Sequence, residues 1–357
     1  MKKVLVLVLA VAIAATAFVS CSKKAVEKTV TASAPAVGAT TANTAPAPVA
    51  KKSYTFKYAE LNPNGHIMDL CGDKFAELVA AKSNGRITIE VFPAGQLGDE
   101  KTMYQTLQMG GGAIDICRGN TNSLGDFGVK KLTLFGLPFI FRDRAHLWSV
   151  LNSEIGKEFL NEPQEIGTGM VGLSYLDEGS RNFFLKKNIT INSIADFKGL
   201  KLRVPTTALM TETVSALGVQ STPISFSELY SALQAGTVDG AEQPHSGYYS
   251  NKFYEVAPNY ILTGHTYSPS IILMSENAFN KLDADDQAII REAATETAEW
   301  NRASIEKLDT ELLQKIKDAG ANVVEVKDKT PYINATKDVV IKYAKGLENY
   351  YEAILAK

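Results

Sequence analysis

Short apolar runs alternate with amphipathic runs along the first half of the chain, from about residue 53 onward. Residues 54–58 alternate aromatic and polar side chains, which is typical of a half-buried strand. Residues 67–83 carry apolar side chains at helical spacing, and Asn84-Gly85 ends that helix. The further predicted elements are a strand at 87–92, a helix at 100–109 capped by Asp99, and a buried strand at 113–117. This alternation predicts an α/β fold with a mostly parallel sheet and helices on both faces.

The second half repeats the pattern and predicts a second α/β domain. It contains a strand at 200–204, a helix at 211–217 and a helix at 227–235 that ends at Gly236. Residues 283–320 are rich in Ala, Glu, Lys and Leu and contain no Pro, which predicts a helix of about 50 Å that could bridge both domains. Residues 332–357 predict one or two terminal helices.

The first 52 residues stand apart from this pattern. Lys2 and Lys3 precede an apolar run that ends in small residues before Cys21, so residues 1–20 are interpreted as a secretory signal peptide. The segment ending at Cys21 resembles a bacterial lipobox, which would make Cys21 the diacylated N-terminus; an ordinary cleaved signal and an uncleaved anchor are the alternatives. Residues 21–52 predict a flexible tether. We therefore expect a periplasmic or cell-surface protein, anchored to the lipid bilayer of a bacterial membrane through Cys21.

Charge, cysteines and motifs exclude several classes. The net charge of -2 provides no strongly basic surface, which argues against a nucleic-acid partner. Cys71 and Cys117 could pair in an exported protein, but we favour two buried thiols. The chain has no Gly-x-Ser-x-Gly, His-Glu-x-x-His or phosphate-loop motif, and its four His lack metal-ligand spacing. We therefore predict a protein that is not an enzyme and has no cofactor and no metal site.

Arg203 is the best candidate for a ligand contact. Ligands of open α/β sheets bind beyond the carboxyl ends of strands, and Arg203 alternates with Leu200 and Leu202 in a strand that Pro205 ends. Its planar guanidinium can form two parallel bonds with a carboxylate, a geometry that Lys cannot reproduce. The competing interpretation is a solvated surface charge, which is what most Arg side chains are.

Weaker candidates lie on either side of Arg203. Arg181 follows a Gly turn and is either a second anion donor or an ion-pair partner of Asp177 or Glu178. Phe226 could line a pocket wall, although an aromatic side chain here is more often part of a core. Residues 239–244 are interpreted as a turn after a helix, with two side chains suited to polar contacts, Glu242 and Gln243.

Four long segments occur in a fixed order: FPAGQLG at 92–98, LPFIF at 137–141, IADFKGLKLRVP at 194–205 and ELYSALQAGTVDG at 228–240. Together they resemble the solute-binding proteins of tripartite ATP-independent periplasmic (TRAP) transporters. The resemblance extends from about Tyr54 to the C-terminus. It implies a two-domain periplasmic-binding-protein clamshell with hinge strands, which closes on a monocarboxylate or dicarboxylate and delivers it to a membrane permease driven by an ion gradient. The domains would be 53–178 plus 269–308, and 179–268 plus 309–357.

The resemblance also assigns roles to individual residues. It implies that Arg203 pairs with the ligand carboxylate, that Arg181 supports it and that Phe226 packs against the ligand. Glu100 and Asn120 fall near first-domain positions that contact the distal part of ligands. Independently of the resemblance, the candidate site includes Asn62, from the loop that follows the first strand, and the turn residues Glu242 and Gln243.

Two residues depart from the family pattern. Gln243 stands where the family usually has Asn, and its longer amide could shift the ligand or accommodate a smaller one. Arg118 is unexpected and could pair with Asp115 or face the cleft as a second anion site. Two alternatives to carboxylate transport stay open: an uncharged or hydrophobic ligand in the same fold, and a surface lipoprotein without a transport role.

Overall fold

The computed structural model describes residues 51–357. The predicted signal peptide, the lipidation of Cys21 and the tether up to residue 50 lie outside these residues. The predicted tether also includes Lys51 and Lys52, but both contact the folded body. The Lys51 ammonium donates to Asp285 at 2.7 Å, and the Lys52 carbonyl accepts from Arg86 at 2.9 Å. The folded part therefore begins two residues earlier than predicted.

The first of two sheets has the strand order β2-β1-β3-β10-β4. Its strands are β1 (Tyr54–Ala59), β2 (Ile87–Phe92), β3 (Ile116–Asn120), β4 (Met170–Leu176) and β10 (Ser270–Ser275). The helices of this part of the chain are α1 (Ile67–Lys82), α2 (Glu100–Gln108), α3 (Lys130–Thr133), α4 (Arg144–Leu151), α5 (Glu154–Glu165) and α9 (Glu276–Phe279). We call this sheet with its helices the first lobe.

The second sheet has the order β11-β9-β5-β8-β6-β7, and with its helices it forms the second lobe. Its strands are β5 (Arg181–Leu185), β6 (Lys201–Val204), β7 (Gln220–Pro223), β8 (Gly240–Gln243), β9 (Asn259–Thr266) and β11 (Asn322–Glu325). The helices are α6 (Ala208–Ser215), α7 (Leu229–Ala235) and α8 (His245–Ser250). Gly236 closes α7 in the left-handed region, with φ 75°, as the sequence predicts.

Both sheets are mixed. In the first, β1 is parallel to β2 and β3, whereas β10 is antiparallel to β3 and β4. In the second, β5 is antiparallel to β8 and β9, and the other pairings are parallel. Every antiparallel pairing involves β5 or β10, the strands that follow the two crossings between the sheets that contain no helix. No helix precedes these strands, so the alternation of strands and helices could not reveal them.

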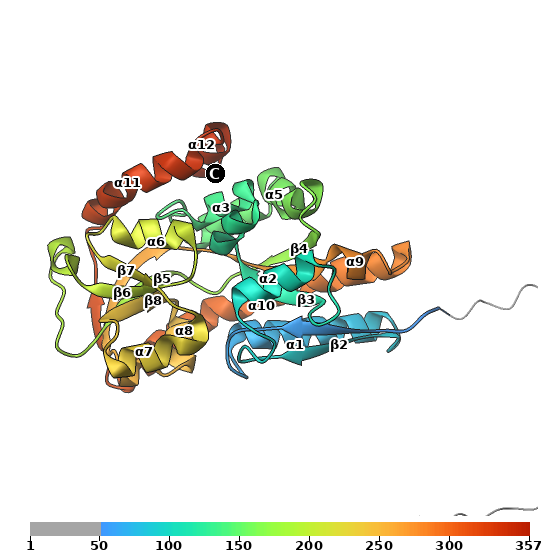
Figure 1. Ribbon diagram of the computed structural model, residues 1–357, viewed down its shortest axis with the longest axis horizontal. Helices are drawn as coiled ribbons and strands as arrows, with labels where there is room; N and C mark the ends of the chain where they lie inside the picture. The colour runs from blue at the N-terminus through green and yellow to red at the C-terminus, as the bar shows by residue number, and fades with distance from the viewer. Residues whose placement is uncertain (1–50) are drawn as a thin grey trace, which may run out of the picture. The chain divides into compact units, whose positions relative to one another are not determined.

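Three C-terminal helices connect the lobes. α10 (Ala284–Asp318) packs on α1 and β4 of the first lobe and on α8 of the second, so the predicted bridging helix is confirmed (Figure 1). α11 (Thr330–Ala344) packs on α6, and α12 (Glu348–Leu355) follows it. No helix within residues 51–357 has the length and apolarity needed to cross a lipid bilayer.

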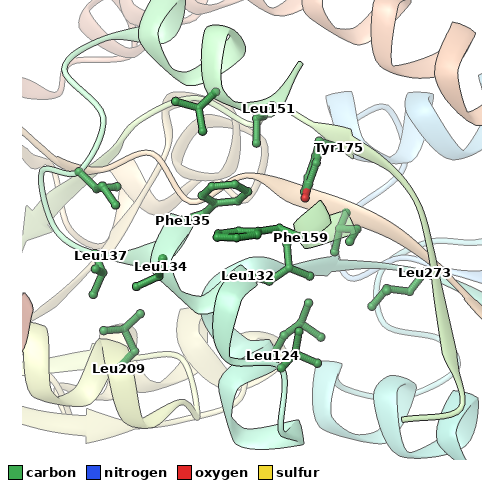
Figure 2. Close-up of a cluster of buried hydrophobic side chains, with 14 of the residues drawn as sticks. Leu124, Leu132, Leu134, Phe135, Leu137, Leu151, Phe159, Tyr175, Leu209 and Leu273 are labelled. Carbon is green, nitrogen blue, oxygen red and sulfur yellow. The ribbon is translucent and has the colours of Figure 1, made fainter. Parts of the chain in front are cut away.

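The largest core cluster also joins the lobes. Figure 2 shows Phe135 and Phe159 in contact near its centre, with ring centroids 5.0 Å apart and ring planes tilted by 33°. Leu209 belongs to α6 of the second lobe, yet it is 2% exposed and packs within this first-lobe cluster. The contact holds the two lobes together beside the cavity described below.

Two strands differ from the sequence prediction. β3 begins at Ile116 and continues through Arg118, Gly119 and Asn120, whereas the prediction ended it at residue 117. The predicted turn at 239–244 is wrong, because Gly240–Gln243 is the buried strand β8. Both strands carry polar side chains at their carboxyl ends, which conceals the apolar pattern of a buried strand.

Candidate functional site

A cavity lies where both lobes meet, beyond the carboxyl ends of β1, β3 and β6. It has an empty volume of about 420 Å³, a figure that includes the solvent space at its open mouth. Its wall consists of Leu61, Asn62, Glu100, Arg118, Asn120, Asn122, Glu178, Arg181, Arg203, Pro205, Phe226 and Gln243. All of the predicted site residues line it except Glu242.

Arg203 enters the cavity from the carboxyl end of β6 and is 2% exposed. Its Nε donates to the Ile224 carbonyl at 2.8 Å. Its Cζ lies 5.8 Å from the centroid of the Phe226 ring. Nη1 is buried and has no hydrogen-bond partner within residues 51–357. Burial lowers the pKa of Arg203 to about 10, because no carboxylate is bonded to the guanidinium. A bound anion would supply the missing partner.

Arg181 is buried in the same wall but already has a carboxylate. Its Nη2 donates to Glu242 Oε1 at 2.9 Å, and its Nε bonds the other oxygen of that carboxylate. Burial alone would raise the pKa of Glu242, but the charge and hydrogen bonds of Arg181, together with the nearby His265, lower it to about 2. The alternative pairing of Arg181 with Asp177 or Glu178 is not observed.

Glu242 therefore requires a correction. It is fully buried behind the cavity wall, and its carboxylate is occupied by Arg181 and approached by His265 Nε2 at 3.6 Å. The structure therefore does not support the expected ligand contact of Glu242. Glu242 instead fixes the position and the charge of Arg181.

Arg118 faces the cavity from β3 and is paired in the same way. Its Nε and Nη2 donate to the two oxygens of Glu60 at 2.9 and 2.7 Å. Asn62 donates to Glu60 through both its backbone and its side-chain nitrogen, at 2.7 and 2.8 Å. The considered pairing with Asp115 is wrong, because Asp115 instead accepts from the backbone of Gly112 and Lys57.

Glu100 and Asn120 form one side of the first-lobe wall. Glu100 Oε1 accepts from the Asn120 backbone at 2.9 Å and from Tyr104 Oη at 3.0 Å, and Oε2 accepts from Ser123 Oγ at 2.7 Å. The Asn120 side chain caps the following 3-10 helix by accepting from Asn122 at 3.1 Å. Both residues lie on the wall, with most of their hydrogen-bonding capacity already used.

Gln243 and Phe226 complete the second-lobe wall. Gln243 is 5% exposed at the end of β8, and Phe226 lies half-buried at the start of a short 3-10 helix. The Gln243 side chain forms no hydrogen bond with residues 51–357, so its amide is available to a ligand. Phe226 offers an apolar surface beside Arg203.

Sequence reasoning missed Glu60, Asn122 and the position of Glu178 on the cavity wall. Asn122 is 3% exposed, and its Nδ2 joins Arg203 Nη1 as a buried donor of the cavity wall without a partner in the described part of the chain. Glu60 and Glu178 follow the carboxyl ends of β1 and β4 within two residues. The rule that ligands bind beyond these ends could have identified both.

The two cysteines of the described part of the chain do not form a disulfide. Cys71 and Cys117 are free and fully buried, so the favoured interpretation is confirmed. Burial raises the pKa of both thiols. Residues 51–357 contain no group of three or more His, Cys, Asp or Glu arranged to hold a metal ion.

Comparisons with known proteins identify similar chains. The family described as bacterial extracellular solute-binding protein, family 7, matches residues 58–346. A solute-binding protein of Verminephrobacter eiseniae is 33% identical over 273 residues, which cover 76% of this chain and 80% of the relative. The C4-dicarboxylate-binding periplasmic protein DctP of Rhodobacter capsulatus is 31% identical over 247 residues, covering 69% and 72%. The crystal structure of a TRAP periplasmic solute-binding protein of Pseudomonas putida F1 with bound D-glucuronate is similar with a TM-score of 0.81 and 31% identity, covering 85% and 97%.

Proposed function

The chain belongs to the bacterial extracellular solute-binding proteins of family 7, and we propose that its cavity captures a small organic carboxylate for a TRAP-type membrane permease. The observation that carries this proposal is the unpaired guanidinium of Arg203. A buried cation without a counter-ion is costly, and a ligand carboxylate removes that cost while gaining charge-assisted hydrogen bonds.

The proposed binding mode assigns a role to each free donor. The ligand carboxylate bonds Arg203, and the second free donor, Asn122 Nδ2, lies on the same wall. Arg181 and Arg118 add positive potential but hold their own carboxylates. Phe226 covers one face of the ligand, and Gln243 contacts its polar groups. Glu100, Asn120 and Asn62 shape the first-lobe wall.

The proposal also includes the domain boundaries, the location of the protein and the fate of its ligand. We propose the domain division 53–178 plus 269–308 and 179–268 plus 309–357, which is supported by the changes of sheet between β4 and β5 and between β9 and β10. The protein acts outside the cytoplasm, as its family does. Its anchoring through Cys21 rests on the sequence alone. Because the family consists of binding proteins, we propose that the ligand is released unchanged.

Calorimetry on the full chain tests this function. D-glucuronate and a panel of other small acids are titrated into the wild type and into Arg203→Lys. Loss of the bidentate geometry is expected to weaken acid binding at least about tenfold, equivalent to about 1.4 kcal/mol. Arg302→Lys, at an exposed position of α10, is the matched control and should bind like the wild type. Equal affinity of Arg203→Lys and the wild type would refute the assignment of Arg203.

A further inference from the structure

Glu178 is a buried carboxylate that the carboxylate-binding function does not use. It lies in the crossing between β4 and β5, is 4% exposed and lines the cavity. Its backbone carbonyl accepts from Ser246 Oγ at 3.1 Å, which ties the residue to α8. Its carboxylate accepts no hydrogen bond from residues 51–357. Glu178 thus differs from Glu100, whose two oxygens accept three hydrogen bonds.

The nearest basic group, His66, does not neutralise Glu178. His66 Nδ1 accepts from the Met68 backbone at 3.1 Å as the N-cap of α1, so that nitrogen carries no proton. The ring proton is then on Nε2, and the imidazole is neutral. Nε2 lies 3.9 Å from Glu178 Oε1, which is too far for a hydrogen bond. Burial also lowers the pKa of His66.

The three arginines of the cavity wall differ in whether a carboxylate compensates their charge. Arg118 is compensated by Glu60, and Arg181 by Glu242. This leaves one uncompensated cation, Arg203, among the residues that line the wall. After a ligand carboxylate has bound Arg203, the wall charges that remain are the carboxylates of Glu100 and Glu178. A second ligand carboxylate would therefore meet like charge in a poorly solvated cavity.

We propose that Glu178 determines specificity by accepting a hydrogen bond from a ligand hydroxyl and by repelling a second carboxylate. The protein would thus select hydroxylated monocarboxylates over dicarboxylates of the same length. The family alone does not decide between these classes, since similar proteins are described with a C4-dicarboxylate and with D-glucuronate. This inference rests on the proposed function, because it assumes that the first carboxylate is bound by Arg203.

Matched pairs of acids test the inference in calorimetric titrations of the full chain. D-gluconate and D-glucarate differ only in a terminal hydroxymethyl or carboxylate group, and D-erythronate and meso-tartrate form the same pair with four carbons. The wild type should bind the better monoacid at least about tenfold more tightly than its diacid partner, because like charges inside a binding site cost several kcal/mol. Glu178→Gln should remove most of this preference, chiefly by strengthening the binding of the diacid.

Two variants serve as controls. Glu178→Asp keeps the charge and should keep the preference, and Glu299→Gln removes an exposed charge of α10 and should leave the preference unchanged. The preference is a ratio within each variant, so a moderate loss of folded protein does not alter it. Equal binding of monoacid and diacid by the wild type, or the same preference in Glu178→Gln, would overturn the role of Glu178 alone. Absence of binding of every acid would overturn the proposed function and this inference with it.

Discussion

Arg181 and Arg203 lie on the same wall of one cavity, yet their electrostatic surroundings are opposite. Both are almost fully buried on strands that flank β8. Arg181 forms two bonds with Glu242, whereas Arg203 bonds only a backbone carbonyl. Burial alone would lower the pKa of both, but Glu242 raises that of Arg181, while the pKa of Arg203 falls to about 10. Arg181 is therefore neutralised within the protein, whereas Arg203 has no charged partner within residues 51–357.

The first-lobe wall strengthens this contrast. Arg118 repeats the arrangement of Arg181, with Glu60 as its counter-ion and Asn62 as a further donor to that carboxylate. Each lobe thus supplies one internally paired arginine, and only the second lobe supplies a free one. A count of cavity arginines would therefore overestimate the number of ligand carboxylates.

The largest expected effect comes from breaking the ion pair of Arg181 and Glu242. Glu242→Gln leaves Arg181 buried without a counter-charge and should lower the free energy of unfolding by about 3–5 kcal/mol. Urea denaturation of ligand-free protein measures this loss. Glu154→Gln removes a carboxylate that accepts from Lys157 at 2.8 Å on the surface, and it should cost less than about 1 kcal/mol. Similar losses in the two variants would contradict the role of Glu242 as the buried counter-ion of Arg181.

The ion pair of Arg181 and Glu242 should also make the stability of the folded protein depend on pH. The pKa of Glu242 lies near 2 in the folded protein, below its ordinary value of 4.5, so its contribution to stability is complete above pH 4.5. This contribution should disappear as the pH falls from about 4.5 to about 2. Denaturation curves at several pH values should therefore differ between the wild type and Glu242→Gln most strongly above this range, and the difference should shrink within it.

The next effect concerns the free arginine and has the opposite sign. Arg203→Met removes an uncompensated buried charge, so the ligand-free protein should gain about 1 kcal/mol of stability although a bond to Ile224 is lost. Acid binding should disappear in calorimetry. The protein is first unfolded and dialysed to remove bound acid, because a ligand would stabilise the wild type selectively. A strong destabilisation by this substitution would show that Arg203 has a structural role.

The smallest expected effect concerns the amide beside these arginines. Gln243→Asn shortens the side chain by one carbon, which gives the ligand about 1.5 Å more room. We expect affinities to change by less than about tenfold, with the preference moving from shorter to longer acids of one series. Titration of four-, five- and six-carbon hydroxy acids measures this shift. An unchanged order of affinities would exclude Gln243 from the ligand contacts.

The elements with regular apolar spacing could be predicted from the sequence. β2 was predicted with its observed bounds, and α1, α2 and α10 within two residues at each end. The prediction failed at β3 and β8, where Arg118, Asn120 and Gln243 occupy strand positions on the cavity wall. Polar side chains needed for binding replaced the apolar signal, so the strands were hardest to recognise where they form the site.

Some residues of the candidate site could be predicted from the sequence, and others could not. Arg203 could be placed from its position at the end of a strand and from the surrounding motifs. The partner of Arg181 could not, because Glu242 is 61 positions away in the chain and its pairing depends on the antiparallel contact of β5 with β8. The role of Glu178 could not be predicted for a similar reason, since its isolation from cations becomes visible only after the carboxylate partners of Arg118 and Arg181 are known.

The long helix α10 has a consequence for how this protein can be divided. Its 35 residues place Ile290 and Ile305 in a core cluster of the first lobe and Ile316 in a core cluster of the second. Asn301 of the same helix exchanges hydrogen bonds with the backbone of Asp177, where the chain leaves the first sheet. The core of each lobe includes side chains of α10, so a lobe excised without this helix would expose an apolar groove. The lobes are therefore not interchangeable modules, and a chimera must exchange both together with the helix that they share.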